Sequence, residues 1–211
     1  MIYRLCLRRV FVILAPSLIM LAGCIGGKSS PAKFYVLNSL PNPEAEKQVT
    51  AAEHGVAIGV GPVAIPPYLD RPEIVTRASG NELHLAEFER WAEPLQQNFS
   101  RVLAENLAVL IPTDRTAIFP WKQSTAIDYQ VAVEVTRFEG YADGHSSLMA
   151  RWNIVGPDGK KELVARQSSF SASANALGYE ARVSALSRMV ADLSREIATA
   201  IKGLSPKAPD K

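Results

Sequence analysis

Two stretches of the chain repeat apolar residues at intervals of three and four, the spacing of one face of an α-helix. The longer stretch predicts a helix over Tyr179–Ile201 that packs on one face of a sheet. The shorter predicts a helix over Pro94–Leu110, which begins at a proline suited to a first helical turn and ends before Pro112. The apolar positions are Leu95, Phe99, Val102, Leu103, Leu107 and Leu110 in the first helix and Tyr179, Val183, Leu186, Val190, Leu193, Ile197 and Ile201 in the second.

Other stretches alternate apolar and polar residues, which predicts half-buried β-strands. The alternation is clearest over Tyr129–Phe138 and continues over Leu148–Val155 and Leu163–Ser171. These three strands are expected to form an antiparallel meander, with the Gly140–Ser147 segment as the first connecting loop. Three further strands are predicted at Lys33–Leu40, Val56–Ala64 and Ala117–Phe119.

A hairpin is predicted just before the first helix. Ile74–Ala78 and Leu83–Ala86 flank Ser79-Gly80-Asn81, whose glycine and asparagine tolerate the positive φ of a tight turn. Strands, a helix, more strands and a final helix predict a single α/β domain of the layered α+β kind, with two long helices packed on a sheet. The pattern does not give the order of the strands.

The first residues are typical of an exported lipoprotein. Arginines precede a short apolar run, Val10–Leu21, which ends in Leu21-Ala22-Gly23-Cys24. This order predicts a signal peptide over 1–23, too short for an ordinary spanning helix, and its end resembles a bacterial lipobox. We therefore expect Cys24 to carry fatty acyl chains of the palmitate kind. A Gly/Ser/Pro-rich tether over 24–32, a folded domain over 33–204 and a disordered tail over 205–211 are expected to follow.

Removal of the signal changes the charge of the protein. Residues 1–23 hold three arginines and no acids, so the mature chain has 23 − 3 = 20 Lys and Arg against 21 Asp and Glu, a net charge of −1. A near-neutral domain gives no support for nucleic-acid binding. Because Cys6 leaves with the signal and Cys24 is the expected anchor, no thiol remains for a disulfide or a metal site.

Motifs that resemble catalytic or cofactor sites have simpler explanations. Residues 59–64 fit a loose G-x-G-x-x-A, but prolines follow and no helix starts, so a bulged strand is predicted. Asp143, His145 and Ser146 lie close in sequence without the rigid nucleophile and oxyanion hole of a triad. The three histidines lack metal-binding spacing. We therefore predict that the protein is not an enzyme and uses neither a metal nor a cofactor.

The stretch Tyr68–Leu95 is the most distinctive part of the chain, because it interleaves charged residues with aromatic and aliphatic ones. Its acids, Glu87, Glu89 and Glu93, are expected to be solvated or to pair with its arginines, Arg71, Arg77 and Arg90. Trp91 and Leu95 are expected in the core at the junction of hairpin and helix, and Arg71 and Arg90 at the surface.

Two segments of this stretch, IPPYLDRPEIVTR and EFERWAEPL, resemble the signature of a known family. The motif is similar to that of the ABC-type transport auxiliary lipoproteins, the PqiC/YmbA-like family, and the resemblance extends over nearly the whole mature chain. It implies a mixed sheet with helices packed on it, similar to the anticodon-binding-like or TolB N-terminal folds.

The resemblance also implies a function. The protein would be a non-enzymatic lipoprotein anchored on the periplasmic face of the outer membrane of a Gram-negative bacterium. It would serve as an accessory subunit of an MCE-type system that moves lipid between the two membranes, docking an MCE-domain partner and supporting envelope integrity. Its Trp, Tyr and Arg content makes one set of residues a candidate docking surface. This set is Tyr68, Asp70, Arg71, Arg77, Arg90 and Trp91.

Two other functions fit the sequence. One is a TolB-like or cell-wall-associated regulatory lipoprotein that binds an envelope enzyme or peptidoglycan. The other is a periplasmic lipid-binding carrier with an apolar cavity of its own. Copurified lipid would favour the carrier, and a copurified MCE protein would favour the transport accessory. Whether the chain forms a homo-oligomer is left open.

Overall fold

The computed structural model describes residues 30–41, 55–111, 113–173 and 178–204. The chain divides into two compact units, residues 1–31 and 32–211, and the sheet and helices belong to the second unit. The predicted signal peptide, Cys24, most of the tether and the C-terminal tail lie outside the described residues.

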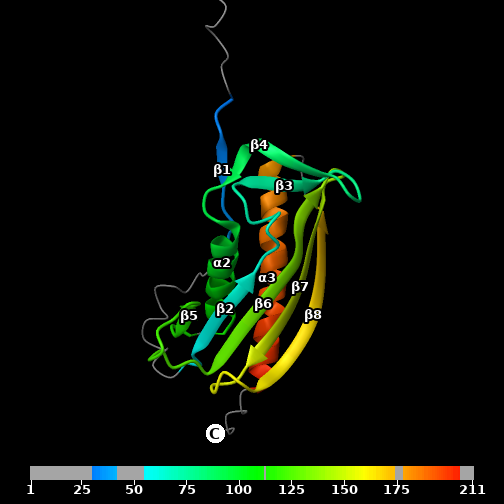
Figure 1. The fold of residues 1–211 in the computed structure, drawn as a ribbon. Helices are drawn as coiled ribbons and strands as arrows, with labels where there is room; N and C mark the ends of the chain where they lie inside the picture. Colours follow the sequence, from blue (N-terminus) through cyan, green and yellow to red (C-terminus); the bar gives the residue numbers. More distant parts are fainter. Residues whose placement is uncertain (1–29, 42–54, 112, 174–177, 205–211) are drawn as a thin grey trace, which may run out of the picture. The chain divides into compact units, whose positions relative to one another are not determined.

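The second unit is built on an eight-stranded mixed sheet covered on one face by two helices (Figure 1). The path through the sheet is β1-β4-β3-β6-β2-β5, with β7 and then β8 on the other side of β6. The strands are β1 (Lys33–Tyr35), β2 (Ile58–Ala64), β3 (Glu73–Arg77), β4 (Leu83–Trp91), β5 (Thr116–Ile118), β6 (Tyr129–Tyr141), β7 (His145–Val155) and β8 (Glu162–Ser173). The helices are α2 (Leu95–Leu110) and α3 (Tyr179–Leu204). The layered α/β prediction is therefore confirmed.

The long strand β6 organises the sheet because it pairs with three other strands. Along one edge its N-terminal half pairs in parallel with β2, and its last residues pair in parallel with β3. Along its other edge it pairs antiparallel with β7, which pairs antiparallel with β8. The predicted meander is therefore confirmed. The β1, β3 and β4 strands lie at one end of β6, and β5 lies at the other end (Figure 1).

Both predicted helix faces are buried in a common core. Phe99, Leu103 and Ile197 have no exposed surface, and the other predicted apolar positions are buried except Leu110 and Tyr179, which are half-buried. Phe99 meets Phe138 of β6 edge to face, with ring centroids 5.4 Å apart. Burial of such side chains contributes about 1.5–3 kcal/mol each relative to exposure, so these contacts hold the helices on the sheet.

The first predicted strand, Lys33–Leu40, is wrong in its second half. Strand β1 ends at Tyr35, and the next residues donate their backbone N–H groups to helix side chains instead of a strand. The Leu37 N–H donates to Asn98 Oδ1 at 3.3 Å, and the Leu40 N–H donates to Asn106 Oδ1 at 2.7 Å. Because buried N–H groups need partners, these asparagines explain why the apolar faces of the helices carry polar residues.

The first loop of the meander is shorter than predicted. Strand β6 continues through Tyr141 and β7 starts at His145, so only residues 142–144 connect them. The alternation of large apolar residues ends before strand β6 does, because a small residue, Gly140, faces the helices there. A Cβ atom on Gly140 would lie 2.3 Å from Cδ of Arg182, so the arginine of α3 fills the space.

The glycine motif at residues 59–64 is a bulged strand, as predicted. The pairing of β2 with β6 shifts register between Val60 and Val63. Gly61 has φ +122°, and a Cβ atom there would lie 2.6 Å from Cβ of Phe119. The glycine is therefore required by its backbone conformation and by the close approach of the loop after β5.

Candidate functional site

The distinctive stretch lines a surface pocket of about 300 Å³. It runs from the turn before β3 through β4 to the start of α2, so the pocket sits where sheet and helix meet. The lining residues are Asp70, Arg71, Pro72, Trp91, Ala92, Glu93 and Pro94. Three of the six predicted docking residues, Asp70, Arg71 and Trp91, therefore come together in one place.

Asp70 has a structural task in this pocket because α2 begins after a proline. Pro94 stands at the N-cap and offers no side-chain oxygen to the free N–H groups of the first turn. Asp70 Oδ1 accepts from the Gln96 N–H at 3.2 Å, which satisfies one of them from a distant loop. The acid also lies at the positive end of the helix dipole. The turn around Leu69 holds it there, since the Leu69 N–H donates to the Pro66 carbonyl at 2.9 Å.

The charges around the pocket pair differently from the sequence prediction. Arg71 Nε pairs with Glu73 at 2.9 Å, and this hydrogen bond, with the nearby charge of Arg90, lowers the pKa of the Glu73 carboxyl. Glu93 pairs with Arg101 of α2 at 2.6 Å instead of with an arginine of the hairpin. The hydrogen bond that Arg101 donates to Glu93 in turn raises the pKa of Arg101. Of the two alternatives left open for Glu93, solvation or pairing with Arg71, Arg77 or Arg90, the structure shows neither in full: Glu93 is partly exposed and pairs with Arg101.

Tyr68 and Arg77 belong to a second group, built around a buried acid that sequence reasoning missed. Glu139 of β6 has no exposed surface. Arg77 Nε donates to it at 2.5 Å and the Tyr68 hydroxyl at 3.3 Å, while Arg137 Nε lies 3.7 Å away. Burial, with the negative charge of Glu139, raises the pKa of Tyr68, so the folded state favours its neutral hydroxyl. The hydrogen bond to Glu139 raises the pKa of Arg77.

The core and surface predictions for this stretch agree with the observed burial. Trp91 is 6% exposed and Leu95 is 1% exposed. The Arg71 side chain is 38% exposed, and Arg90 is half-buried. The part of the candidate surface that a partner could touch is therefore Asp70, Arg71 and Arg90, because Trp91 is buried.

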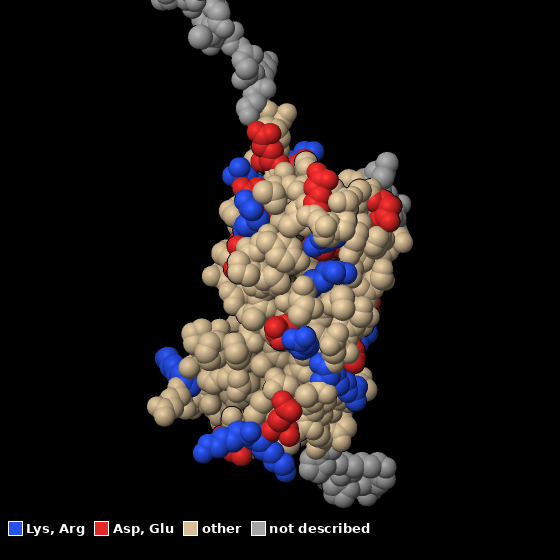
Figure 2. All heavy atoms as spheres, turned by 45° about the vertical axis from the view of Figure 1, so that its right-hand side comes forward, with Lys and Arg blue, Asp and Glu red and all other residues tan. Residues whose placement is uncertain are grey.

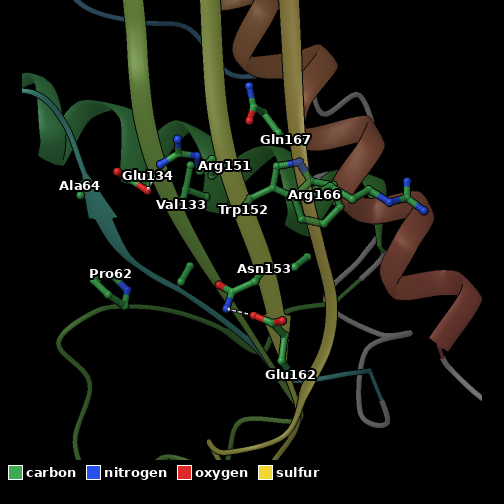
Figure 3. A pocket seen from close by; sticks show the side chains of 12 residues that line it. Pro62, Ala64, Val133, Glu134, Arg151, Trp152, Asn153, Glu162, Arg166 and Gln167 are labelled. Carbon is green, nitrogen blue, oxygen red and sulfur yellow. Dashed lines mark hydrogen bonds and ion pairs between the residues drawn. The ribbon is translucent and has the colours of Figure 1, made fainter.

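A second hollow, of about 590 Å³, lies on the sheet face opposite the helices (Figure 3). Small residues of three strands, Ala64, Ala132 and Ala165, contribute to its lining. Its polar side chains are paired within the domain: Arg151 lies 3.4 Å from Glu134, and Asn153 donates to Glu162 at 2.9 Å. Acidic and basic side chains are interspersed over the face drawn in Figure 2, in keeping with the near-neutral charge of the mature chain.

The Asp143, His145 and Ser146 group does not form a triad. His145 Nδ1 contacts Asp143, and its ring stacks on Tyr141 with centroids 3.9 Å apart. Ser146 is the next residue of β7 and is fully buried, without a hydrogen-bond partner for Oγ in the structure. Successive strand residues point to opposite faces, so the serine faces the helices, away from the histidine.

Within residues 30–41, 55–111, 113–173 and 178–204, no group of three or more His, Cys, Asp or Glu side chains could hold a metal ion. Within the same ranges, no helix has the length and apolar character needed to cross a membrane.

Residues 35–198 match the family model of the ABC-type transport auxiliary lipoprotein component. This chain belongs to that family. The family is a group of transport auxiliary lipoproteins, which are not enzymes, so the non-enzymatic prediction is confirmed. The match includes β2 through most of α3, and therefore both groups of residues described above.

The ABC-type transport auxiliary family also accounts for the relatives found by sequence. The chain is 28% identical over 184 residues to "Intermembrane transport lipoprotein PqiC" of Escherichia coli strain K12, covering 87% of this chain and 93% of that protein. The protein of the same name from Shigella flexneri matches equally. The chain is therefore similar to lipoproteins that serve envelope transport in Gram-negative bacteria.

Solved structures share the fold. A crystal structure of an uncharacterized protein has a TM-score of 0.66 at 23% identity, covering 82% of this chain and 99% of the other. Protein XCC0632 from Xanthomonas campestris has a TM-score of 0.61 at 16% identity, covering 82% and 97%. At these identities the likeness concerns the fold alone.

Proposed function

We propose that this chain is an outer-membrane lipoprotein, held by acyl chains on Cys24, that docks an MCE-domain partner of an intermembrane lipid transport system. Support comes from the lipobox-like sequence before Cys24 and from the similarity to the PqiC lipoproteins. Three parts of this proposal go beyond family membership: the MCE-domain partner, the outer-membrane placement and the role in envelope integrity.

The observation that carries the docking proposal is the pocket at the start of α2. Trp91 lines this pocket, Asp70 caps the first turn of α2, and Arg71 pairs with Glu73. The Arg71 and Arg90 side chains reach solvent. Arginines supported by a packed aromatic residue are typical of protein-binding hot spots. The predicted candidates Tyr68 and Arg77 contribute indirectly, through the buried Glu139.

Affinity capture of the native lipoprotein tests this proposal. The double variant Arg71→Glu with Arg90→Glu should fold normally and lose most of the captured MCE-domain protein, because two favourable charges become repulsive. The matched control is Arg151→Glu with Arg195→Glu, two arginines of which 62% and 52% of the side chain is exposed on other parts of the domain. Capture by the control should equal that of the unmodified protein.

Three results would argue against the proposal. Normal capture by the folded Arg71 and Arg90 double variant would remove this surface from the interface. Copurification of stoichiometric lipid without a protein partner would favour the lipid carrier. Capture of a cell-wall enzyme or peptidoglycan in place of an MCE-domain protein would favour the regulatory lipoprotein.

A further inference from the structure

Strand β1 exposes large apolar side chains close to where the chain enters the domain. Phe34 is 65% exposed and Val36 is 41% exposed, whereas Leu37 is 1% exposed. Tyr35 points to the helix side, with its ring centroid 6.5 Å from that of Tyr179 on α3. Alternation along an extended segment therefore directs Phe34 and Val36 away from the helices.

One basic side chain lies beside this apolar pair. In the parallel pairing of β1 with β4, Phe34 is the register partner of Arg90, so both side chains lie on the same face. Lys33 is exposed, but as the residue before Phe34 it points to the opposite side of the strand. An aromatic ring beside a long basic side chain matches the chemistry of a phospholipid interface, in which aromatic rings enter the acyl boundary and long basic side chains reach the phosphates.

The part of the chain that precedes the domain indicates which surface covers this pair. Cys24, the proposed anchor, lies ten residues before Phe34 in the sequence. A flexible coil of that length spans about 17 Å. Strand β6, with 13 residues, is about 43 Å long, so the tether is short relative to the domain. A lipid at Cys24 therefore holds the β1 end closer to the membrane than the β5 end.

We propose that Phe34 and Val36 contact the phospholipid surface in which the Cys24 acyl chains are embedded. This contact orients the domain with its β1 end on the membrane and its β5 end toward the periplasm. The proposal rests on the lipid anchor of the proposed function, but it assigns a separate task to residues outside the pocket at α2.

Fluorescence quenching by brominated lipid tests the contact directly. Phe34→Trp and Phe119→Trp are compared in the lipidated protein, reconstituted in phosphatidylethanolamine and phosphatidylglycerol vesicles with bromine on the acyl chains. Phe119 is the matched control, because it is an aromatic residue that is 51% exposed after β5, at the opposite end of the domain (Figure 1). Fluorescence of the unmodified protein, which contains three tryptophans, is subtracted.

We expect the brominated lipid to quench the added tryptophan at position 34 several-fold more than the one at position 119. Equal quenching at the two positions, or none at position 34, would overturn the proposal. A blue shift at position 34 that depends on protein concentration and occurs without vesicles would also overturn it, because a second copy would then cover the face.

A second arm separates this inference from the lipid anchor itself. The mature chain, starting at Cys24, is coupled through its only thiol to a maleimide lipid in the same vesicles. Quenching at position 34 in the coupled protein supports the contact even if the cell does not lipidate Cys24. Partner capture in detergent should be unchanged in Phe34→Ser, whereas Arg71→Glu with Arg90→Glu should lose it.

Discussion

Glu139 forms a buried ion pair that joins β3 to β6. It is fully buried, and it pairs with Arg77, whose side chain is 18% exposed, across 62 residues of sequence. Removing one partner of a buried ion pair leaves the other charge uncompensated, whereas an exposed pair contributes little. Tyr68 and Arg77 thus contribute to the distinctive stretch by holding its first part against β6 through Glu139, whereas Asp70 caps α2 and Arg71 pairs with Glu73.

We predict that Glu139→Gln lowers the free energy of unfolding by about 3 kcal/mol, because Arg77 loses its counter-ion in a buried site. The matched control is Glu134→Gln on the same strand, whose side chain is 57% exposed and whose pair with Arg151 should contribute less than about 1 kcal/mol. Urea denaturation of both variants checks this. The combined Arg77→Met and Glu139→Met variant should recover part of the loss, and a cost equal to the control would contradict the role of Glu139.

At the scale of elements, the segment after β1 depends on the helices instead of a neighbouring strand. Asn98 and Asn106 of α2 and Ser187 of α3 accept its backbone N–H groups. This arrangement fixes where the chain leaves β1, and it ties the part of the domain nearest the tether to both helices. A buried N–H that loses its acceptor costs about 1–3 kcal/mol.

We predict that Asn106→Leu destabilises the domain by about 1–3 kcal/mol, since the Leu40 N–H loses its acceptor and the leucine cannot replace it. The variant also loses the hydrogen bond that Asn106 donates to Ser194 Oγ at 3.1 Å, but the Ser194 hydroxyl keeps its own bond to the Val190 carbonyl at 2.7 Å. Gln97→Leu, on the exposed face of the same helix, should change stability by less than about 0.5 kcal/mol. Amide hydrogen exchange should speed up at Leu40 in the first variant and stay unchanged in the second.

At the scale of the whole molecule, the proposed function depends on which membrane holds the chain. The residue after Cys24 is Ile25, and an aspartate at that place retains lipoproteins at the inner membrane in many Gram-negative bacteria. The eight residues Ile25–Ala32 span less than about 30 Å even when fully extended, so under the proposed lipidation of Cys24 the domain would work close to its membrane.

We predict that Ile25→Asp is lipidated and folded but moves to the inner membrane and fails to restore detergent resistance in a strain lacking the native copy. Membrane fractionation and a detergent-sensitivity assay measure the two effects. Ile25→Ala should behave as the unmodified protein, and Cys24→Ser should lose labelling by a fatty-acid probe. A variant at the inner membrane that still restores full resistance would contradict the outer-membrane role.

The sequence by itself determined the features that repeat within a short window. The helix faces around Phe99 and Ile197 and the alternation that forms β6, β7 and β8 follow from periods and residue types that act locally. The hairpin of β3 and β4 also lies where the sequence placed it, but Gly80 and Asn81 do not have the positive φ expected of its turn. The candidate residues Trp91, Leu95, Arg71 and Arg90 could be sorted into core and surface in the same way, because bulk and charge decide burial.

Only the tertiary structure decided which distant groups meet. The order of strands around β6, the early end of β1, and the pairing of Glu139 with Arg77 depend on partners far away in the sequence. The sequence around Glu139 does not distinguish it from a solvated acid on a strand, because the residues that pair with it, Tyr68 and Arg77, are far away in the sequence. Backbone N–H groups likewise pair with the acceptors that the packed helices bring within reach. The Leu40 N–H donates to Asn106, so the segment after β1 leaves the sheet although its residue types favour a strand.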